Sequence, residues 1–336
     1  MEEKINIIIP AFNAINTIDR CLYSLLNQTT EEKYRIIVLN DGSTDGTLNK
    51  LLEYKDDNRV EVVNKSNTGA SDTRNRGLEL ANSEYVTFID ADDYVEKDYL
   101  ELLLDQYKKQ QCDLSIVGYC KEEKNGIVRF KGLGTKQNLS REEALHDIFI
   151  STGYEGYLWN KLFKLSIIRE NKISFDNGIK IAEDLLFCCK YLSHCSRISL
   201  NPEVKYHYIV NSDSQINSNK YGSDFKKESL DVLKTYSLIK LIVEPMNYPK
   251  VVSAINASIL WSSTSILRNI YLAPNKKEIS PKLMDELRNN QKKYRYDFLK
   301  NDILPSRDKI IYWLNYYFPS FFAFFWRKLN LKGNGF

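Results

Sequence analysis

The sequence lacks the glycine-rich loops with which many α/β proteins hold the phosphates of a nucleotide. No Gly-x-Gly-x-x-Gly follows the first apolar run, and no Gly-x-x-x-x-Gly-Lys-Ser/Thr occurs anywhere in the 336 residues. These two absences exclude the dinucleotide fingerprint and the P-loop. Any pyrophosphate that this protein binds must therefore be neutralised in another way, and a bound cation can do so.

Histidine and cysteine are also sparse, and neither is arranged as a metal-binding motif. The three histidines are too few and too scattered to predict a zinc site, and the six cysteines show no Cys-x-x-Cys spacing. The segment Met1–Phe12 has no basic start followed by an apolar stretch of the kind that directs export. We therefore expect free thiols in a reducing compartment, most of them in the core.

The residues that are present predict one large α/β domain followed by an appended region. Hydrophobic residues make up 43% of the chain and charged residues 27%, and nothing in the composition suggests disorder. Four β-type runs begin at residues 5, 35, 60 and 85, and helix-like segments separate them at Ile18–Leu26, Leu48–Tyr54 and Arg74–Ala81. Alternating strands and helices favour a parallel sheet.

Each of the four runs ends in a polar cluster. The clusters are Pro10-Ala11-Phe12-Asn13, Asn40-Asp41-Gly42-Ser43, Asn67-Thr68-Gly69 and Asp90-Ala91-Asp92-Asp93. Because ligands of a parallel sheet lie outside the carboxyl ends of the strands, we expect all four clusters to face one pocket. Turn formation and helix capping also use such residues, and they are the plain structural explanation. That explanation accounts less well for Pro10, Phe12 and Arg74.

The acids of the fourth cluster predict a cation site. Asp90 and Asp92 are one residue apart at the end of an apolar run, and a hard divalent cation takes one or two carboxylates and completes its shell with water and substrate phosphates. Phe12 offers a face on which a base can stack, Asp41 can accept a hydrogen bond from a base, and Arg74 can donate to a base carbonyl or a phosphate. Together these residues predict a nucleotide pocket built without glycine loops.

At this point the motifs resemble a known family. The order Ile-Ile-Ile-Pro-Ala-Phe-Asn, Asn-Asp-Gly-Ser-Thr-Asp, Asn-Thr-Gly-Ala-Ser-x-x-Arg-Asn-x-Gly and Phe-Ile-Asp-Ala-Asp-Asp is similar to that of the family 2 glycosyltransferases of the GT-A fold. The resemblance runs from about residue 4 to residue 214. It implies an inverting transferase that uses a nucleotide-diphospho-sugar, most often a UDP-sugar, with Mn²⁺ or Mg²⁺.

The resemblance also assigns roles to residues of the first half. It implies that the nucleoside is held by Pro10, Phe12, Asn13, Asp41 and Arg74, that Asp90 lies near ribose and metal, and that Asp92 ligates the metal. We expect further contacts to the nucleotide-sugar from Ala11, Ser43, Asn67, Gly69 and Ala91.

The same resemblance places the acceptor side later in the chain. Trp159, Asn160 and Lys161 look like an acceptor motif, and Asp184 matches the catalytic base, with Glu183 beside it. The alternative is that two acids in the first turn of a helix merely complement its dipole.

The segment that follows departs from the family pattern. Relatives often carry Tyr-x-Tyr-Arg, whereas this chain has Tyr206-His207-Tyr208-Ile209. His207 could replace the missing arginine as a metal ligand or diphosphate donor, or be structural. Ser214 matches the closing serine of the family, and residues 211–221 read as a mobile lid.

The C-terminal third differs in charge. Residues 1–223 contain 28 basic and 34 acidic residues, whereas residues 224–336 contain 19 basic and 10 acidic residues. We expect domains at 1–222 and 223–336, with helices in the second at about 225–243, 248–271, 280–299 and 308–329. Residues 310–326 are uncharged and rich in aromatics, and basic residues flank them. The aromatic, basic segment 310–329 predicts an anchor in the plane of an anionic membrane or, alternatively, a homo-oligomer interface.

The family resemblance implies a hexosyl- or N-acetylhexosaminyl-transferase, and the C-terminal segment predicts that it lies on the cytoplasmic face of the membrane. The expected acceptor is a lipid-linked glycan of a bacterial capsule or related surface polysaccharide, and no nucleic-acid partner is expected. A sugar-1-phosphate nucleotidyltransferase would need a glycine-rich loop, which is absent. A catalytically inactive binding or scaffold subunit would lack the metal acids or the base, and this chain has both.

Overall fold

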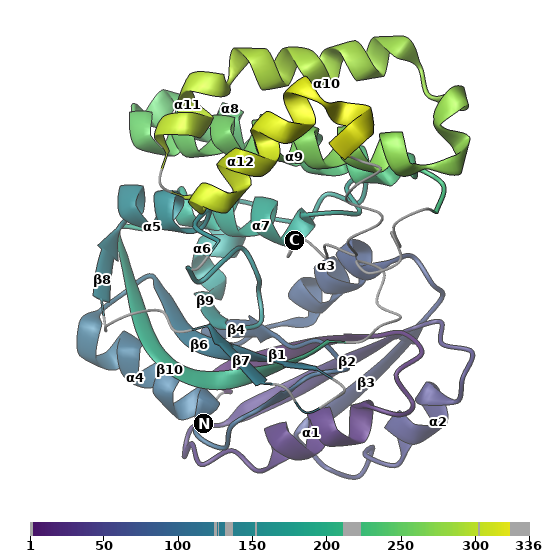
Figure 1. Ribbon diagram of the computed structural model, residues 1–336. Helices are drawn as coiled ribbons and strands as arrows, with labels where there is room; N and C mark the ends of the chain where they lie inside the picture. Colours follow the sequence, from purple (N-terminus) through teal and green to yellow (C-terminus); the bar gives the residue numbers. More distant parts are fainter. Residues whose placement is uncertain are drawn as a thin grey trace. The chain divides into compact units, whose positions relative to one another are not determined.

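The computed structural model consists of two compact units (Figure 1). The sheet unit comprises Met1–Ile148, Thr152–Gly178 and Glu183–Val210, and the helical unit comprises Phe149–Ser151, Ile179–Ala182 and Asn211–Phe336. The structure describes residues 3–123, 126, 128–131, 137–151, 153–210, 223–301 and 303–322, with the side chains of 128–131 left out. The boundary expected at residue 222 falls outside the described residues and stays a prediction.

The first half of the sheet unit is the parallel arrangement that the sequence predicts. Its elements are β1 (Ile5–Ala11), α1 (Ile18–Leu26), β2 (Tyr34–Asp41), α2 (Thr47–Leu52), β3 (Val60–Lys65), α3 (Ala70–Leu80) and β4 (Tyr85–Phe88). The strands are parallel neighbours in the order β3-β2-β1-β4. Their carboxyl ends therefore lie along one edge of the sheet, and the four polar clusters follow them there.

The second half of the sheet unit makes the sheet mixed. Its elements are β5 (Tyr94–Val95), α4 (Tyr99–Gln110), β6 (Leu114–Glu123), β7 (Val128–Lys131), β8 (Gln137–Ser140), α5 (Arg141–Asp147), β9 (Lys161–Lys164), α6 (Leu165–Glu170), α7 (Glu183–Leu192) and β10 (Arg197–Val210). β9 is antiparallel to both β4 and β6 and so joins the two halves. β10 is parallel to β6 and antiparallel to β5.

Helices cover both faces of the first half of the sheet, so the strands are apolar on both sides. Ile7 belongs to a core cluster with Leu22 of α1 and Leu103 of α4. Ile8 points to the opposite face, where it meets α3. A Cβ added at Gly77 of α3 would lie 2.5 Å from Ile8, so glycine is needed for this close approach.

The helical unit is built around one buried helix. Its helices are α8 (Asp231–Val243), α9 (Pro249–Leu272), α10 (Pro281–Lys293), α11 (Arg295–Lys300) and α12 (Ser306–Tyr317). α9 contacts α8, α10, α11 and α12, and most of its side chains are buried. The third predicted helix is divided in two at Tyr294, and the fourth is interrupted at Phe318, after which residues 319–322 are helical again. Its predicted end near residue 329 lies outside the described residues. In the described part of the chain, no helix is both long enough and apolar enough to cross a membrane.

The cysteines agree with the expectation from the sequence. All six are buried free thiols. They act as small apolar side chains in the core.

Candidate active site

The loops after β1 and β2 are fastened to each other. Asn13 has a left-handed backbone, with φ of 52°, and its Oδ1 accepts a hydrogen bond from the Thr44 N–H at 2.9 Å. Ser43 Oγ accepts one from the Asn13 N–H at 3.0 Å. A Cβ at Gly42 would lie 2.7 Å from the backbone nitrogen of Asn67, so this position requires glycine. Asn13, Ser43 and Asn67, which belong to three different predicted clusters, therefore lie at one rim.

Asp41 connects the end of β2 to the third cluster. Its carboxylate accepts hydrogen bonds from Lys65 Nζ at 2.5 Å and from the N–H groups of Thr68 and Gly69, both at 2.9 Å. Burial alone would raise the pKa of Asp41, but these bonds lower it below its ordinary value. Asp41 is therefore ionised and holds the loop that leads into α3.

The first cluster presents one large side chain to solvent. Phe12 is 48% exposed, whereas Ala11 is buried and Pro10 is partly exposed in β1. An exposed phenyl ring at the end of a central strand can serve as a stacking surface. The predicted contacts of these three residues with a nucleoside stay predictions.

The acids that follow β4 have two different environments. Asp90 and Asp92 are partly exposed, whereas Asp93 is fully buried. Asp93 accepts hydrogen bonds from Tyr206 Oη at 2.5 Å and from the Ile209 N–H at 2.7 Å. Burial, together with the charges of Asp92 and Asp90, raises the pKa of Asp93. Asp93 thus links the segment after β4 to β10, and Asp90 and Asp92 are the two acids of this cluster that solvent can reach.

Arg74 brings together acids that lie far apart in the sequence. Its Nη2 donates to Asp90 Oδ1 at 3.2 Å. Its Nη1 donates to Glu183 Oε1 and to Asp184 Oδ1, both at 3.1 Å. The structure therefore joins the predicted donor site to the predicted base through one buried guanidinium.

The charges of this cluster shift the pKa values of Arg74 and Asp184. Burial alone would lower the pKa of Arg74, but Asp184, Asp90 and Glu183 raise it, so the guanidinium stays protonated. Burial raises the pKa of Asp184 well above its usual range, and Arg74 opposes that rise while Glu183 and Asp90 add to it. The Asp184 side chain keeps 20% of its surface exposed. A carboxylate with a raised pKa that solvent can reach is a suitable proton acceptor.

Packing places the two acids at the start of α7. A Cβ at Gly156 would lie 2.7 Å from the Leu185 side chain and 2.9 Å from its Cα, so the segment before β9 lies directly against this helix. Glu183 and Asp184 also lie in the first turn, where the helix dipole favours negative charge. The dipole alone does not explain why both acids share an arginine with Asp90.

The residues predicted for the acceptor side are all buried. Trp159 stacks on Tyr206, with ring centroids 4.2 Å apart. Lys161 Nζ donates to the carbonyl oxygens of Glu155 and Tyr157 and to Asn160 Oδ1. Burial lowers the pKa of Lys161 to about 8, yet three acceptors match the three donors of an ammonium group. These side chains order the segment before β9, and their direct contact with an acceptor stays a prediction.

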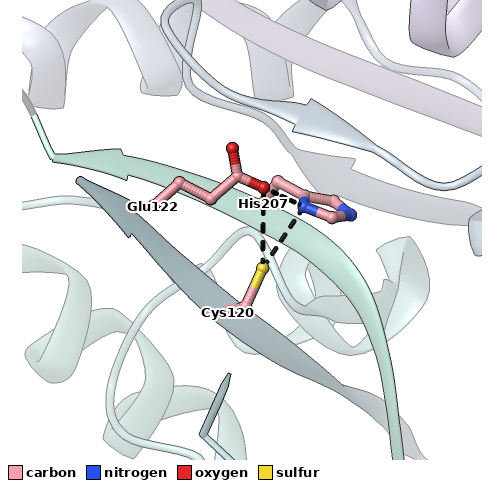
Figure 2. A group of neighbouring side chains, drawn as sticks. All are labelled: Cys120, Glu122 and His207. Atoms are coloured by element: carbon pink, nitrogen blue, oxygen red, sulfur yellow. Dashed lines mark hydrogen bonds and ion pairs between the residues drawn. The ribbon is translucent and has the colours of Figure 1, made fainter. Parts of the chain in front are cut away.

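His207 lies in a different group from the predicted metal acids. Successive side chains of a strand alternate between faces, so His207 points away from the face of Tyr206 and Tyr208. Figure 2 shows it beside Cys120 and Glu122 of β6, and this group contains neither Asp90 nor Asp92. Ser214 and the predicted lid at 211–221 lie outside the described residues.

Sequence reasoning missed the residues that position the site. Arg20 Nη2 donates a hydrogen bond to the backbone oxygen of Asp92 at 2.6 Å. Asp92 follows the buried Ala91 in the chain. Tyr206 and Lys65 hold Asp93 and Asp41. Tyr206 could not be matched with Asp93 because the two are 113 residues apart. Lys65 is the exception, since the pairing of neighbouring strands β2 and β3 puts it opposite Asp41.

Comparisons with known proteins agree with this geometry. Residues 6–163 match the family described as Glycosyl transferase family 2. The chain is 34% identical over 224 residues to the poly(ribitol-phosphate) beta-N-acetylglucosaminyltransferase TarP of Staphylococcus aureus strain N315, which covers 65% of this chain and 67% of that protein. It is 32% identical over 217 residues to a poly(ribitol-phosphate) beta-glucosyltransferase of Bacillus spizizenii. That match covers 63% of this chain and only 33% of the relative.

A solved structure extends the comparison beyond the region of sequence similarity. S. aureus TarS 1-349 in complex with UDP-GlcNAc has a TM-score of 0.66, covering 88% of this chain and 90% of that chain, at 20% sequence identity. At this identity the likeness concerns the fold, and it confirms the predicted GT-A fold. Taken with the sequence match, it shows that the chain belongs to the family 2 glycosyltransferases and is related to the poly(ribitol-phosphate) glycosyltransferases.

Proposed function

We propose that the protein is an inverting glycosyltransferase that moves a hexosyl or N-acetylhexosaminyl group from a UDP-sugar to a hydroxyl of a surface glycan. In an inverting transfer the hydroxyl attacks the anomeric carbon from the face opposite the leaving diphosphate. The reaction therefore needs a base on one side and charge neutralisation on the other. The observation that carries the proposal is that Arg74 holds Asp184 and Asp90 in one cluster.

The rim formed by the first three clusters supports a nucleoside site. The exposed ring of Phe12 can stack on a base. Asp41 receives three hydrogen bonds, and a carboxylate has about four acceptor positions, so one remains for a base N–H. TarS was solved with UDP and with UDP-GlcNAc, which supports uridine as the nucleoside.

Asp90 and Asp92 fit a hard divalent cation. Both are partly exposed carboxylates that follow β4. The sequence contains no glycine-rich loop that could bind phosphates in place of a cation. One or two carboxylates with water and phosphate oxygens are the ligands that Mg²⁺ prefers, and Mn²⁺ accepts similar ligands. When bound, such an ion stabilises negative charge on the diphosphate, an effect worth several kcal/mol in general. Asp92 would be the main protein ligand and Asp90 the second.

Asp184 is the proposed base. It would take the proton of the acceptor hydroxyl as the oxygen attacks, and such assistance is typically worth about 10²–10⁴ in rate. Arg74 keeps Asp184 in place and limits the rise of its pKa. Glu183 shares the same guanidinium nitrogen and would orient the pair.

A partly exposed aromatic surface supports binding of an anionic glycan. Tyr157 and Tyr208 stack with their ring centroids 6.4 Å apart, and Lys121 Nζ lies 5.6 Å and 5.7 Å from these centroids. Burial and the charges of Asp93, Asp90 and Asp92 raise the pKa of Tyr208, which therefore lies near the acids of β4. Rings with a nearby cation suit a sugar or polyol that bears phosphate, and two relatives are named for poly(ribitol-phosphate).

The helical unit supports a location at a membrane surface. Large apolar side chains are exposed at helical spacing in and just after α12, namely Ile310, Leu314, Tyr317, Phe318 and Phe321. A stripe of this kind can enter a membrane interface, and the basic charge of the C-terminal third would favour an anionic leaflet. An enzyme held there would meet lipid-linked acceptors. Burial of the stripe between copies of the chain is the alternative.

A donor screen tests the proposal. The full-length protein is incubated with Mn²⁺ and a panel of UDP-sugars, with and without poly(ribitol-phosphate), and the released UDP is measured. We expect one UDP-sugar to give acceptor-dependent UDP and a product of inverted anomeric configuration by NMR. Pyrophosphate release from UTP and a sugar 1-phosphate would instead reveal a nucleotidyltransferase. Nucleotide binding without any turnover across a broad acceptor panel would favour an inactive subunit.

A further inference from the structure

Cys120, Glu122 and His207 form a second group of side chains that can bind a cation (Figure 2). His207 Nδ1 lies 3.2 Å from Cys120 Sγ and 2.6 Å from Glu122 Oε1, and these sulfur and oxygen atoms are 4.0 Å apart. Tetrahedral zinc, with bonds of about 2.0–2.3 Å, needs its ligand atoms roughly 3.4–3.6 Å apart. Shifts of under about 1 Å would therefore bring the three atoms to the required spacing.

The sheet holds all three ligands on rigid elements. His207 of β10 is paired directly with Cys120 of β6, because the two strands are parallel neighbours. Glu122 lies two residues beyond Cys120 and so points to the same face. Sites that are built on strands keep their geometry better than sites on loops.

A second layer of side chains fixes the histidine ring. His207 Nε2 lies 2.8 Å from Glu96 Oε1, and the ring stacks on Tyr94 with centroids 4.2 Å apart. Tyr94 Oη donates to Glu122 Oε1 at 2.8 Å. A carboxylate on the outer nitrogen is the usual support for a metal-bound histidine, since it orients the ring and makes the inner nitrogen a better ligand.

We propose that Cys120, Glu122 and His207 bind one Zn²⁺, or an ion of similar chemistry, with a fourth position open to water. A set of one sulfur, one nitrogen and one oxygen suits zinc and does not suit Mg²⁺ or Mn²⁺, whereas the acids Asp90 and Asp92 offer only oxygen. Glu122 and His207 are partly exposed, which gives the ion a way in, and Cys120 is buried behind them.

The proposed ion would add a link between β6 and β10. A cysteine ligand gives up its proton when the ion binds, so ion binding releases that proton to solvent. The ion would bind only the folded chain, because the two strands are far apart in the sequence. It should therefore stabilise the protein against heat.

Metal titration of the full-length protein tests the site. The protein is treated with chelator, kept reduced, and titrated with Zn²⁺ against a coloured competing chelator and separately with Co²⁺. We expect one equivalent per chain, a thiolate-to-cobalt band in the near ultraviolet and a higher melting temperature with Zn²⁺. Cys120→Ser should abolish the band and lower the affinity for Zn²⁺ at least about 100-fold. Cys112→Ser, which changes an equally buried cysteine outside the group, should keep both.

Two further variants keep the proposal open to refutation if Cys120→Ser does not fold. Glu122→Gln changes a partly exposed side chain. It should lower the affinity for Zn²⁺ about tenfold or more without altering the fold of the metal-free protein. Asp92→Asn should leave Zn²⁺ binding unchanged. Absence of stoichiometric binding by the native chain would overturn the proposal. So would affinity that survives Glu122→Gln but is lost in Asp92→Asn.

Discussion

The sheet unit buries a few charged side chains together with their partners, whereas the helical unit leaves large apolar side chains exposed in and just after α12. In the sheet unit one buried arginine contacts three acids, and Asp93 is fully enclosed by its partners. In the helical unit Phe318 is 60% exposed and Phe321 is 67% exposed.

This difference indicates two roles, positioning of reacting groups in the sheet unit and association with a surface in the helical unit. Buried pairs fix the positions of reacting groups, because a buried charge that loses its partner is strongly unfavourable. Exposed apolar surface gives association without fixed geometry. Substitutions in the sheet unit should therefore change transfer or folding and leave membrane association alone. Substitutions in the exposed apolar stripe in and just after α12 should do the reverse.

The largest effect should follow Asp184→Asn. Asparagine keeps the shape and can still bond to Arg74, but it cannot accept a proton from the acceptor. Transfer should fall by about 10²-fold or more while affinity for the UDP-sugar changes no more than a few-fold. Initial rates and calorimetry measure the two quantities, and vesicle binding should be unchanged.

Companion variants show whether Asp184 acts alone. Glu183→Gln should lower transfer less than about tenfold if Glu183 orients rather than deprotonates. Asp285→Asn, an exposed acid of α10, is the matched control and should have no effect. Loss of donor binding in Asp184→Asn would assign this residue to the donor site instead.

Asp93→Ala should destabilise the sheet unit without removing any proposed ligand. It leaves the Tyr206 hydroxyl and the Ile209 N–H without their acceptor, and each unpaired buried group costs about 1–3 kcal/mol. Urea unfolding should show a loss of about 2–4 kcal/mol. Asp93→Asn keeps an oxygen for Ile209 and should lose about 1 kcal/mol. Equal stability in all three proteins would show that the contact with β10 does not matter.

Asp92→Asn should weaken the binding of UDP more than the binding of uridine. With Mn²⁺ present, the affinity for UDP should fall more than about tenfold, which is about 1.4 kcal/mol, and uridine should change little. Chelation of the native protein with EDTA should reproduce the effect. Calorimetry gives both affinities, and UDP binding that is the same with and without EDTA would exclude the cation.

The smallest effect should come from the helical unit. Replacing both Leu314 and Phe318 by serine removes exposed apolar surface and should lower binding to anionic vesicles about tenfold, with transfer to a soluble acceptor unchanged. Leu241→Ser, an exposed leucine of α8, is the control. Truncation at residue 310 would be a poorer test, since Tyr312 is fully buried. Unchanged vesicle binding with a smaller mass in light scattering would identify an oligomer interface.

Local sequence patterns predicted the first half of the sheet unit well. The four apolar runs, their helices and the polar clusters at their ends depend on neighbouring residues, and parallel pairing then brings the clusters together. Helix breaks were less predictable in the helical unit, where Tyr294 divides one predicted helix and Phe318 interrupts another. The break at Phe318 directly precedes Pro319, and a residue before proline disfavours the helical conformation.

Contacts between distant strands could not be predicted. The placement of β9 between β4 and β6 and the pairing of β6 with β10 depend on residues that are far apart in the chain. For that reason the sequence suggests His207 as a ligand beside Asp92, and it does not reveal that Cys120 and Glu122 are its neighbours. The expectation that scattered histidines exclude a zinc site has the same weakness, because one histidine can meet cysteine and glutamate across strands.

The buried position of Asp93 limits how far the motif can be transplanted. Grafting Asp90-Ala91-Asp92-Asp93 onto another sheet would transfer two carboxylates that can contact a ligand. The third, Asp93, would lose its hydrogen-bond donors Tyr206 and Ile209. A buried polar group that loses its hydrogen-bond partner typically costs about 1–3 kcal/mol, which is a large part of the stability of a domain. The portable unit is therefore the motif together with the strand that receives its last residue.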